Sequence, residues 1–142
     1  MRELSVALLA TLETKSDEVA FLSQRLADHG VSVRLIDTSL AAKGKVLDGA
    51  AKLNRMTSVV AAAVDTLSDE LEDSCQAVLG LGGGTGGEIA MRVMRALPIT
   101  FPKVLVTTLP FDPRIAVADS SIVLVPTLAD ISGLNATLRE VF

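Results

Sequence analysis

The stretch VLGLGGGTGGEIAM, residues 78–91, places five glycines within six positions, between an apolar run and a helix-like pattern. Such an order of apolar, glycine-rich and periodic segments predicts a strand, a loop and a helix. Glycine adopts positive φ without steric cost, so successive N–H groups of the loop can converge on an anion. The positive end of the following helix would point at the same place. The stretch therefore predicts a phosphate-binding loop after a buried strand.

The residues of the loop exclude two common kinds of phosphate-binding site. Thr85 adds a hydroxyl that can bond a phosphate oxygen or a metal-bound water. The loop contains no lysine, which excludes a P-loop of the GxxxxGK[ST] kind, and its spacing misses the GxGxxG dinucleotide fingerprint. A tight strand-to-helix turn is an alternative interpretation, although such a turn needs only one or two glycines.

Outward from this loop, short apolar runs alternate with helical periodicities along the whole chain. We expect strands at 4–10, 31–37, 77–81, 103–108 and 121–125, and helices at about 14–28, 46–71, 87–97 and 130–142. The second helix is continuous or consists of two helices joined near Asn54. Strands that alternate with helices predict a parallel sheet covered on both faces. The expected fold is one α/β domain over residues 1–142, with a three-layer, doubly wound, mostly parallel five-stranded sheet of flavodoxin or Rossmann type, in order 2-1-3-4-5.

This strand order brings other segments to the glycine loop. Ligands of open α/β sheets bind beyond the carboxyl ends of the strands, where the strand order reverses. The order 2-1-3-4-5 puts that point between the first and third strands, so TLETK, residues 11–15, would face the glycines. Thr107 and Thr108 end the fourth strand at the same edge. They are ligand candidates, although threonine is also a common strand residue.

The segment after the first strand has side chains suited to phosphate. Thr11 and Thr14 offer hydroxyls, and Lys15 can neutralise phosphate charge. Glu13 can help to hold Mg²⁺ among waters. The alternative is plain helix capping, with Thr14 as the N-cap and Asp17 completing a capping box.

The composition excludes several classes of protein. The 142 residues carry a net charge of −4, and no basic tract occurs, so nucleic acid is not an expected partner. No apolar run reaches the ~18 residues of a membrane helix, and the start of the chain lacks a signal-peptide cleavage site. Cys75 is the only cysteine, which favours a reducing compartment. We therefore expect a cytoplasmic domain, not bound to membranes, and assign no metal-ligating residues.

Three segments, in this order, resemble one protein family: ATLETKSDEVAFLSQRL, GLGGGTGGEIAMRVMRALPITFPKVLVTT and DSSIVLVPTLADISGLN. Over nearly its whole length the chain resembles the N-terminal ATP-binding domain of the tomato mosaic virus resistance protein and its bacterial relatives. The resemblance implies that ATP occupies the crevice with its phosphates near the glycine loop. It also implies a homodimer, and a second domain that follows in many relatives.

The chain departs from that family at both loops. The family's first loop reads near Gly-Thr-Leu-Asp-Thr-Lys-Gly-Glu, where this chain has Ala10, Glu13 and Ser16 in place of Gly, Asp and Gly. The family's second loop reads near Gly-Gly-Ser-Gly-Gly-Thr, so the hydroxyl of Thr85 is placed differently. Residues 82–86 also match the Gly-Gly-Gly-Thr-Gly of tubulin-type GTPases, but the chain is too short for that fold. A late family motif is matched by Asp130, Ile131, Gly133, Leu134 and Asn135.

We hypothesise that the domain binds ATP, with or without Mg²⁺, at this crevice. Hydrolysis would need Glu13 or Glu18 to orient a water, and no catalytic residue is assigned. The candidate ligand-binding residues are Thr11, Glu13, Thr14, Lys15, Gly82, Gly83, Gly84, Thr85, Gly86, Gly87, Thr107 and Thr108. Two alternatives stay open: a homodimeric assembly domain that uses its last helix and has a structural glycine loop, and a small-molecule enzyme acting on a phosphate ester.

Overall fold

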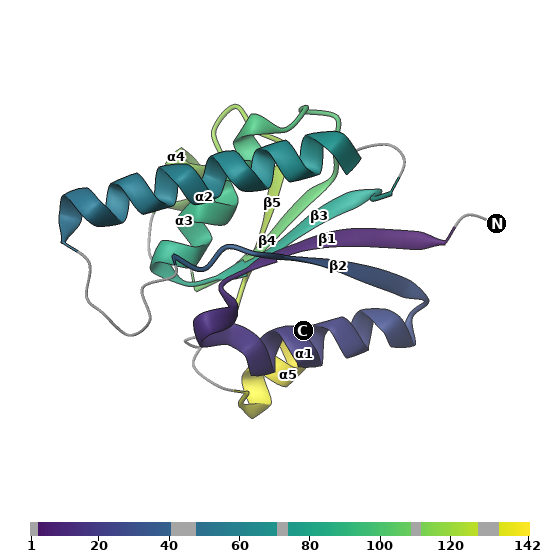
Figure 1. The fold of residues 1–142 in the computed structure, drawn as a ribbon. Coiled ribbons are helices and arrows are strands. Elements are labelled where there is room, and N and C mark those ends of the chain that lie inside the picture. Colours follow the sequence, from purple (N-terminus) through teal and green to yellow (C-terminus); the bar gives the residue numbers. More distant parts are fainter. Residues whose placement is uncertain (1–2, 41–47, 71–73, 109–111, 128–133) are drawn as a thin grey trace.

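Five parallel strands form one sheet in the order β2-β1-β3-β4-β5, as the sequence predicts (Figure 1). The computed structural model describes residues 3–40, 48–70, 74–108, 112–127 and 134–142. The strands are β1 (Leu4–Ala10), β2 (Val31–Asp37), β3 (Ala77–Gly82), β4 (Lys103–Thr107) and β5 (Ile122–Pro126). The helices are α1 (Leu12–Asp28), α2 (Gly49–Glu70), α3 (Gly84–Ala96), α4 (Pro113–Ala116) and α5 (Ala136–Val141).

Alternate side chains of the strands enter two separate cores. On one face, α2 and α3 pack against a set that includes Leu9 and Leu105. On the other face, α1 and α5 pack against a set that includes Leu8, Leu81 and Val106 (Figure 1). Strands buried on both faces must be apolar at nearly every position, which is why β1 and β3 read as continuous apolar runs. The expected three-layer α/β architecture is confirmed.

Several element boundaries differ from the sequence-based expectation. Helix α3 begins three residues earlier than predicted, at Gly84, and α4 lies in a segment predicted to be a loop. Helix α2 is continuous from Gly49, so no break occurs near Asn54. Helix α5 begins at Ala136, because the Asn135 side chain accepts a hydrogen bond from the Leu138 N–H at 2.9 Å and caps it there.

Candidate phosphate-binding site

The loop after β3 is shorter than predicted, since most of its glycines form the first turn of α3. The N–H of Gly87 donates to the carbonyl oxygen of Gly83 at 2.8 Å, as the first helical hydrogen bond. The N–H groups of Gly84, Thr85 and Gly86 precede that bond and have no acceptor among the described residues. Unpaired N–H groups at a helix N-terminus carry partial positive charge and favour an anion.

Close approach to the first turn of α3 requires glycine at position 82, whereas Gly83, Gly84 and Gly86 have room for a Cβ. Gly30 is the only described glycine with positive φ (+77°), so the expectation of positive φ in the glycine loop is wrong. A Cβ on Gly82 would lie 2.6 Å from the carbonyl carbon of Gly86 and from the nitrogen of Gly87. The end of β3 therefore lies directly against the first turn of α3, with no room for a side chain between them.

The ends of β1 and β4 lie beside this turn. A Cβ on Gly86 would be 3.7 Å from the Thr11 hydroxyl, and one on Gly83 would be 3.8 Å from the Thr108 hydroxyl. The added Cβ of Gly84 would meet no atom within 4 Å. The structure thus brings the glycines together with the threonines that the sequence placed at the same sheet edge, and it leaves open space in front of Gly84.

Thr107 is a buried polar residue whose hydroxyl has no hydrogen-bond partner in the described parts of the chain. Its side chain is 0% exposed, and its Oγ1 is the buried side-chain atom left unpaired among the described residues. The oxygen lies 3.2 Å from the position of a Cβ on Gly87, next to the first turn of α3. By contrast, the buried Lys103 at the other end of β4 donates to the Pro98 carbonyl oxygen at 2.8 Å and the Ser121 hydroxyl at 3.0 Å. Buried polar groups are normally satisfied, so the Thr107 hydroxyl stays a candidate for ligand contact.

The start of α1 is organised differently from the predicted capping box. Helix α1 begins at Leu12 with Thr11 in the N-cap position, so the expectation of Thr14 as N-cap with Asp17 is wrong. The caps come from the end of β2: Asp37 Oδ1 accepts from the Leu12 N–H at 3.1 Å, and the Ser39 hydroxyl oxygen accepts from the Glu13 N–H at 3.1 Å.

The hydrogen bonds that Asp37 accepts at this cap favour its charged form. Burial tends to raise the pKa of Asp37, but hydrogen bonds from the Ser39 hydroxyl, the Leu12 N–H and the Ser39 N–H outweigh it and lower the pKa. The shortest of these bonds joins the Ser39 hydroxyl to Asp37 Oδ1 at 2.6 Å. Neither Asp37 nor Ser39 is among the site residues predicted from the sequence. The available signal was the polar Asp-Thr-Ser sequence at the end of an apolar strand, a position that meets the sheet edge.

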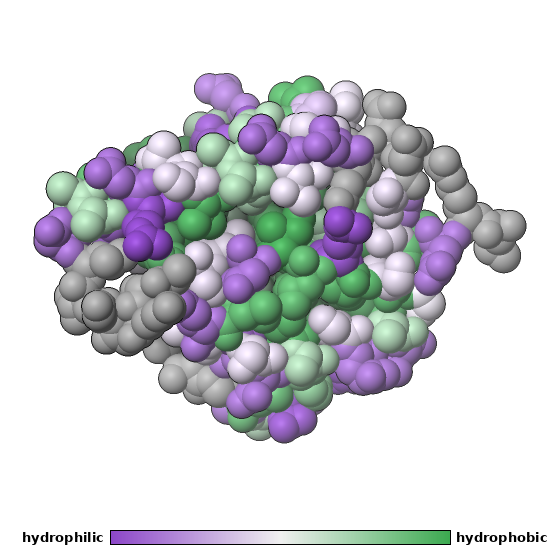
Figure 2. All heavy atoms as spheres, viewed as in Figure 1, coloured by the Kyte–Doolittle hydropathy of each residue, from purple (hydrophilic) through white to green (hydrophobic). Residues whose placement is uncertain are grey.

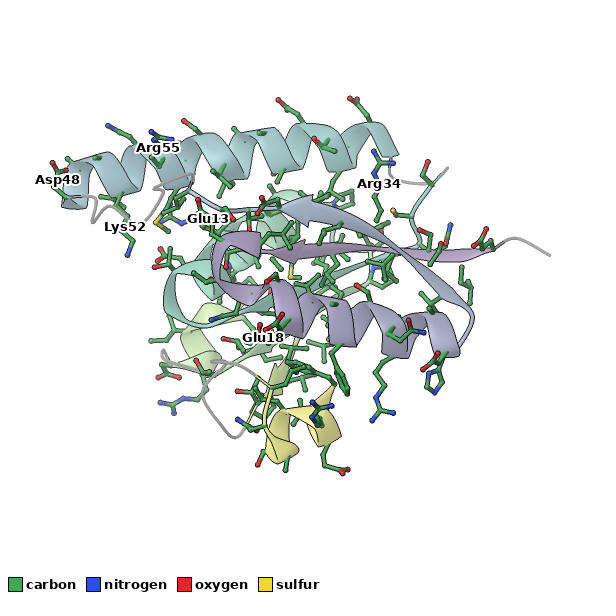
Figure 3. The ribbon with its side chains drawn as sticks, turned by 60° about the horizontal axis from the view of Figure 1, so that its bottom comes forward. Glu13, Glu18, Arg34, Asp48, Lys52 and Arg55 are labelled. Atoms are coloured by element: carbon green, nitrogen blue, oxygen red, sulfur yellow. The ribbon has the colours of Figure 1, made fainter. Side chains whose placement is uncertain are left out.

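The remaining candidates on α1 take different positions. The hydroxyls of Thr11 and Thr14 are 3.1 Å apart. Lys15 is half-buried at a kink in α1 (φ −126°, ψ 22°) and makes no ion pair with a described residue. Glu13 and Glu18 project from different sides of α1 (Figure 3), and Glu18 is buried. The two carboxylates therefore do not converge on one point.

A polar pair near α4 does not enter the described part of the site. Arg114 and Asp112 pair with each other at 3.0 Å near α4, with the Arg114 side chain largely exposed. Residues 109–111 and 128–133, which include most of the late family motif, lie outside the described residues. Among the described residues, no group of three or more His, Cys, Asp or Glu side chains could hold a metal ion.

The geometry defines a class of protein: a parallel, three-layer α/β domain with a glycine-rich helix start at the point where the strand order reverses. Residues 41–142 match the family described as Uncharacterised protein family (UPF0261) N-terminal domain, which includes β3, the glycines and α3. The chain belongs to this family.

Curated relatives extend the similarity to the start of the chain. A UPF0261 protein of Mesorhizobium japonicum and one of Clostridium tetani are each 29% identical, over 96% of this chain and 39% of their own length. The ToMV susceptible protein tm-1 of Solanum lycopersicum is 26% identical, over 96% of this chain and 23% of its own length. The chain thus spans about two fifths of the bacterial relatives, and the resemblance to the tomato protein family is confirmed.

None of the helices in the described parts of the chain combines the length and the hydropathy that crossing a membrane requires.

Proposed function

We propose that this domain binds the phosphate groups of a nucleotide, with ATP as the first candidate, at the start of α3. One observation carries the proposal: the N–H groups of Gly84, Thr85 and Gly86 have no acceptor among the described residues, and the buried Thr107 hydroxyl, also without a described partner, lies 3.2 Å from the Cβ position of the next residue, Gly87. An anion with several oxygens accepts from N–H groups and hydroxyls at once, which is what a phosphate group offers. The family resemblance makes ATP the nucleotide to test first.

Each residue has a defined part in this proposal. The three N–H groups of α3 donate to phosphate oxygens, and Thr107 donates its hydroxyl proton. Thr11 and Thr108 lie beside Gly86 and Gly83 and are placed to donate to outer phosphate oxygens. Lys15, which has no ion pair among the described residues, contributes positive charge. Mg²⁺ supplied with the nucleotide would be held mainly by phosphates and waters, with Glu13 as the candidate carboxylate.

Calorimetric titration with ATP, GTP and inorganic phosphate, each with and without Mg²⁺, tests the proposal. The informative variant is Gly84→Val, because a Cβ on Gly84 meets no atom within 4 Å and the added side chain projects into the space left for phosphate. The matched control is Gly49→Val, since Gly49 is the first residue of α2 and its Cβ would also meet no atom within 4 Å.

The proposal predicts ATP binding that Gly84→Val weakens by about tenfold or more, a loss of roughly 1.4 kcal/mol, while Gly49→Val leaves it unchanged. If ATP, GTP and inorganic phosphate bound equally well, the site would recognise a phosphate ester without preference for a base. The absence of binding by every ligand, in a folded protein, would contradict the proposal.

A second candidate function is assembly through the exposed edge of the sheet. Strand β2 is an edge strand, whose outer N–H and C=O groups can pair with another chain. Figure 2 shows hydrophobic surface between α1 and α2, where β2 lies, and Leu35 of this strand is 41% exposed. Light scattering after size exclusion tests this candidate: a homodimer that Leu35→Lys dissociates supports it, and a monomer at all concentrations contradicts it.

A further inference from the structure

Helix α5 covers only part of the sheet face on which it lies. Helices α1 and α5 share this face (Figure 1) and have 17 and 6 residues. At 1.5 Å per residue, α1 is about 25 Å long and α5 only about 9 Å. The two neighbouring helices therefore cover very different lengths of the strands beneath them.

The uncovered part is a row of apolar side chains across three strands. The row under α5 consists of Leu81, Val106 and Val125. The next row on the same face, toward the amino ends of the strands, consists of Leu79, Val104 and Val123. In the first row Leu81 is fully buried, whereas in the second Leu79 and Val104 are half-buried and Val123 is 56% exposed. Side-chain exposure therefore rises from one row to the next, toward the amino ends of the strands and away from α5.

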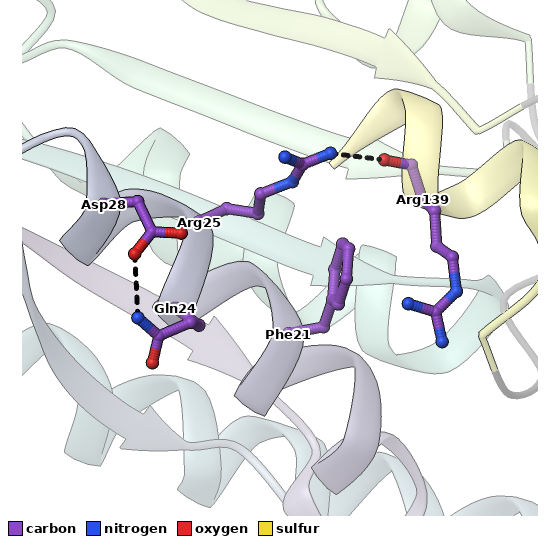
Figure 4. A pocket seen from close by; sticks show the side chains of 5 residues that line it. All are labelled: Phe21, Gln24, Arg25, Asp28 and Arg139. Atoms are coloured by element: carbon purple, nitrogen blue, oxygen red, sulfur yellow. Dashed lines mark hydrogen bonds between the residues drawn. The ribbon is translucent and has the colours of Figure 1, made fainter.

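Helix α1 lies beside this strip, since Leu79 packs against the core set that includes Val19 and Leu22 of α1. Phe21, Gln24, Arg25 and Asp28 recur at steps of three and four along one side of α1 and, with Arg139 of α5, line a cavity of about 360 Å³ (Figure 4). The rings of Phe21 and Phe142 lie 6.5 Å apart, so α5 meets α1 at Phe21. Gln24 and Asp28 lie further along α1, where α5 no longer runs beside it.

The wall carries more positive than negative charge. The guanidinium carbons of Arg25 and Arg139 lie 5.4 Å and 5.0 Å from the centre of the Phe21 ring. Arg25 donates to the Arg139 carbonyl oxygen at 3.3 Å, and neither guanidinium forms an ion pair with a described residue. The Asp28 carboxylate already accepts from the Gln24 amide at 2.9 Å. Carboxylates of a partner could pair with both guanidinium groups, which form no ion pair within the described residues.

We propose that this groove, with Leu79, Val104 and Val123 as its floor and α1 as its wall, docks one acidic amphipathic α-helix lying end to end with α5. The occupant is the polypeptide that follows this N-terminal domain in the longer relatives, of which the chain spans 39%. Its apolar side covers the exposed row, and its carboxylates pair with Arg25 and Arg139. The proposal is independent of nucleotide binding.

Thiol labelling measures this cover directly, because the native Cys75 is buried at 1% exposure. We would fuse to Phe142 the ~20 residues, about 30 Å as a helix, that follow the matched segment in the Mesorhizobium japonicum relative. Val123→Cys is the probe. Leu53→Cys on α2, on the opposite face of the sheet and 55% exposed, is the matched control. Labelling rates are compared between each chain alone and its fusion.

The proposal predicts that the fusion slows labelling of Val123→Cys by about tenfold, as when nine tenths of the molecules are covered, and leaves Leu53→Cys unchanged. Charge reversal with Arg25→Glu and Arg139→Glu restores fast labelling in the fusion. Equal labelling with and without the fused segment overturns the proposal. Labelling of Val123→Cys in the unfused chain that slows as protein concentration rises also overturns it, because a second copy then covers the groove.

Discussion

Helices α1 and α3 begin at the same edge of the sheet, yet their first N–H groups have opposite fates. In α1, the N–H groups of Leu12 and Glu13 donate to the Asp37 and Ser39 side chains, and those of Thr14 and Lys15 donate to the Thr11 carbonyl oxygen. In α3, the corresponding groups of residues 84–86 have no acceptor in the described part of the chain. The first N–H groups of α1 thus have acceptors within the fold, whereas those of α3 have none among the described residues. Because of this difference, the start of α3 is the candidate anion site.

The largest effect is expected where β3 meets α3. In Gly82→Ala the new methyl group would lie 2.6 Å from backbone atoms, which cannot move aside as a flexible side chain would. Such overpacking should destabilise the fold by about 3 kcal/mol. Urea denaturation measures this loss. Gly84→Ala is the control and should change stability little, because its methyl group has open space. If Gly82→Ala and Gly84→Ala were equally stable, the close packing of Gly82 against the first turn of α3 would not contribute to stability.

A smaller effect is expected at the start of α1. Asp37→Ala removes the acceptor of the Leu12 N–H and should cost about 1 kcal/mol, the typical worth of a helix cap. ATP affinity should stay the same, because α3 is untouched. Thermal denaturation and calorimetry measure the two quantities. A loss of ATP binding together with the cap would show that the two helix starts are not separate.

The capping effect of Asp37 should depend on pH. Its pKa is lowered on folding, so the carboxylate stabilises the folded state above its ordinary value of 3.8, and this contribution is lost as the pH falls below that value. The stability difference between wild type and Asp37→Ala should therefore be constant near neutral pH and shrink in acid below about pH 4. A difference that grows in acid would contradict the lowered pKa.

The smallest effect on stability is expected at Thr107. Thr107→Val removes a buried hydroxyl that has no partner among the described residues, so the free protein should keep its stability or gain up to about 1 kcal/mol. ATP affinity should fall by about fivefold, the worth of one hydrogen bond. Denaturation and calorimetry on the same samples distinguish this result from a structural role, in which stability falls and affinity does not.

The sequence predicts the fold well because its signals are local. Apolar runs such as LSVALLA and AVLGL identify buried strands, and the alternation in VSVRLID agrees with an edge position for β2. The predicted strand order brings the glycines, Thr11 and Thr108 to one edge, and the structure has them there. Gly30 has φ +77° directly after the C-cap of α1, as is common for a glycine that follows a helix.

The details of the site depend on contacts that are distant in the sequence. Glycine has low helix propensity, so residues 84–86 read as loop, whereas packing of Gly82 against the first turn makes them helical. Asp37 reaches Leu12 across 25 positions, which no local pattern reveals. Whether the Thr107 hydroxyl has a hydrogen-bond partner depends on the tertiary packing around it, which the local sequence does not reveal. The ligand-binding roles assigned from the sequence stay predictions.

The central claim is that the N–H groups at the start of α3 donate hydrogen bonds to a bound anion, and their amide chemical shifts report on this directly. In ¹H–¹⁵N spectra of the labelled protein titrated with ATP, the amides of Gly84, Thr85 and Gly86 should show the largest shifts, while those of Leu12 and Glu13 stay nearly constant. The claim would be contradicted if saturating ATP left the amide resonances of Gly84, Thr85 and Gly86 unshifted. It would also be contradicted if the amide resonances at the starts of α1 and α3 shifted equally.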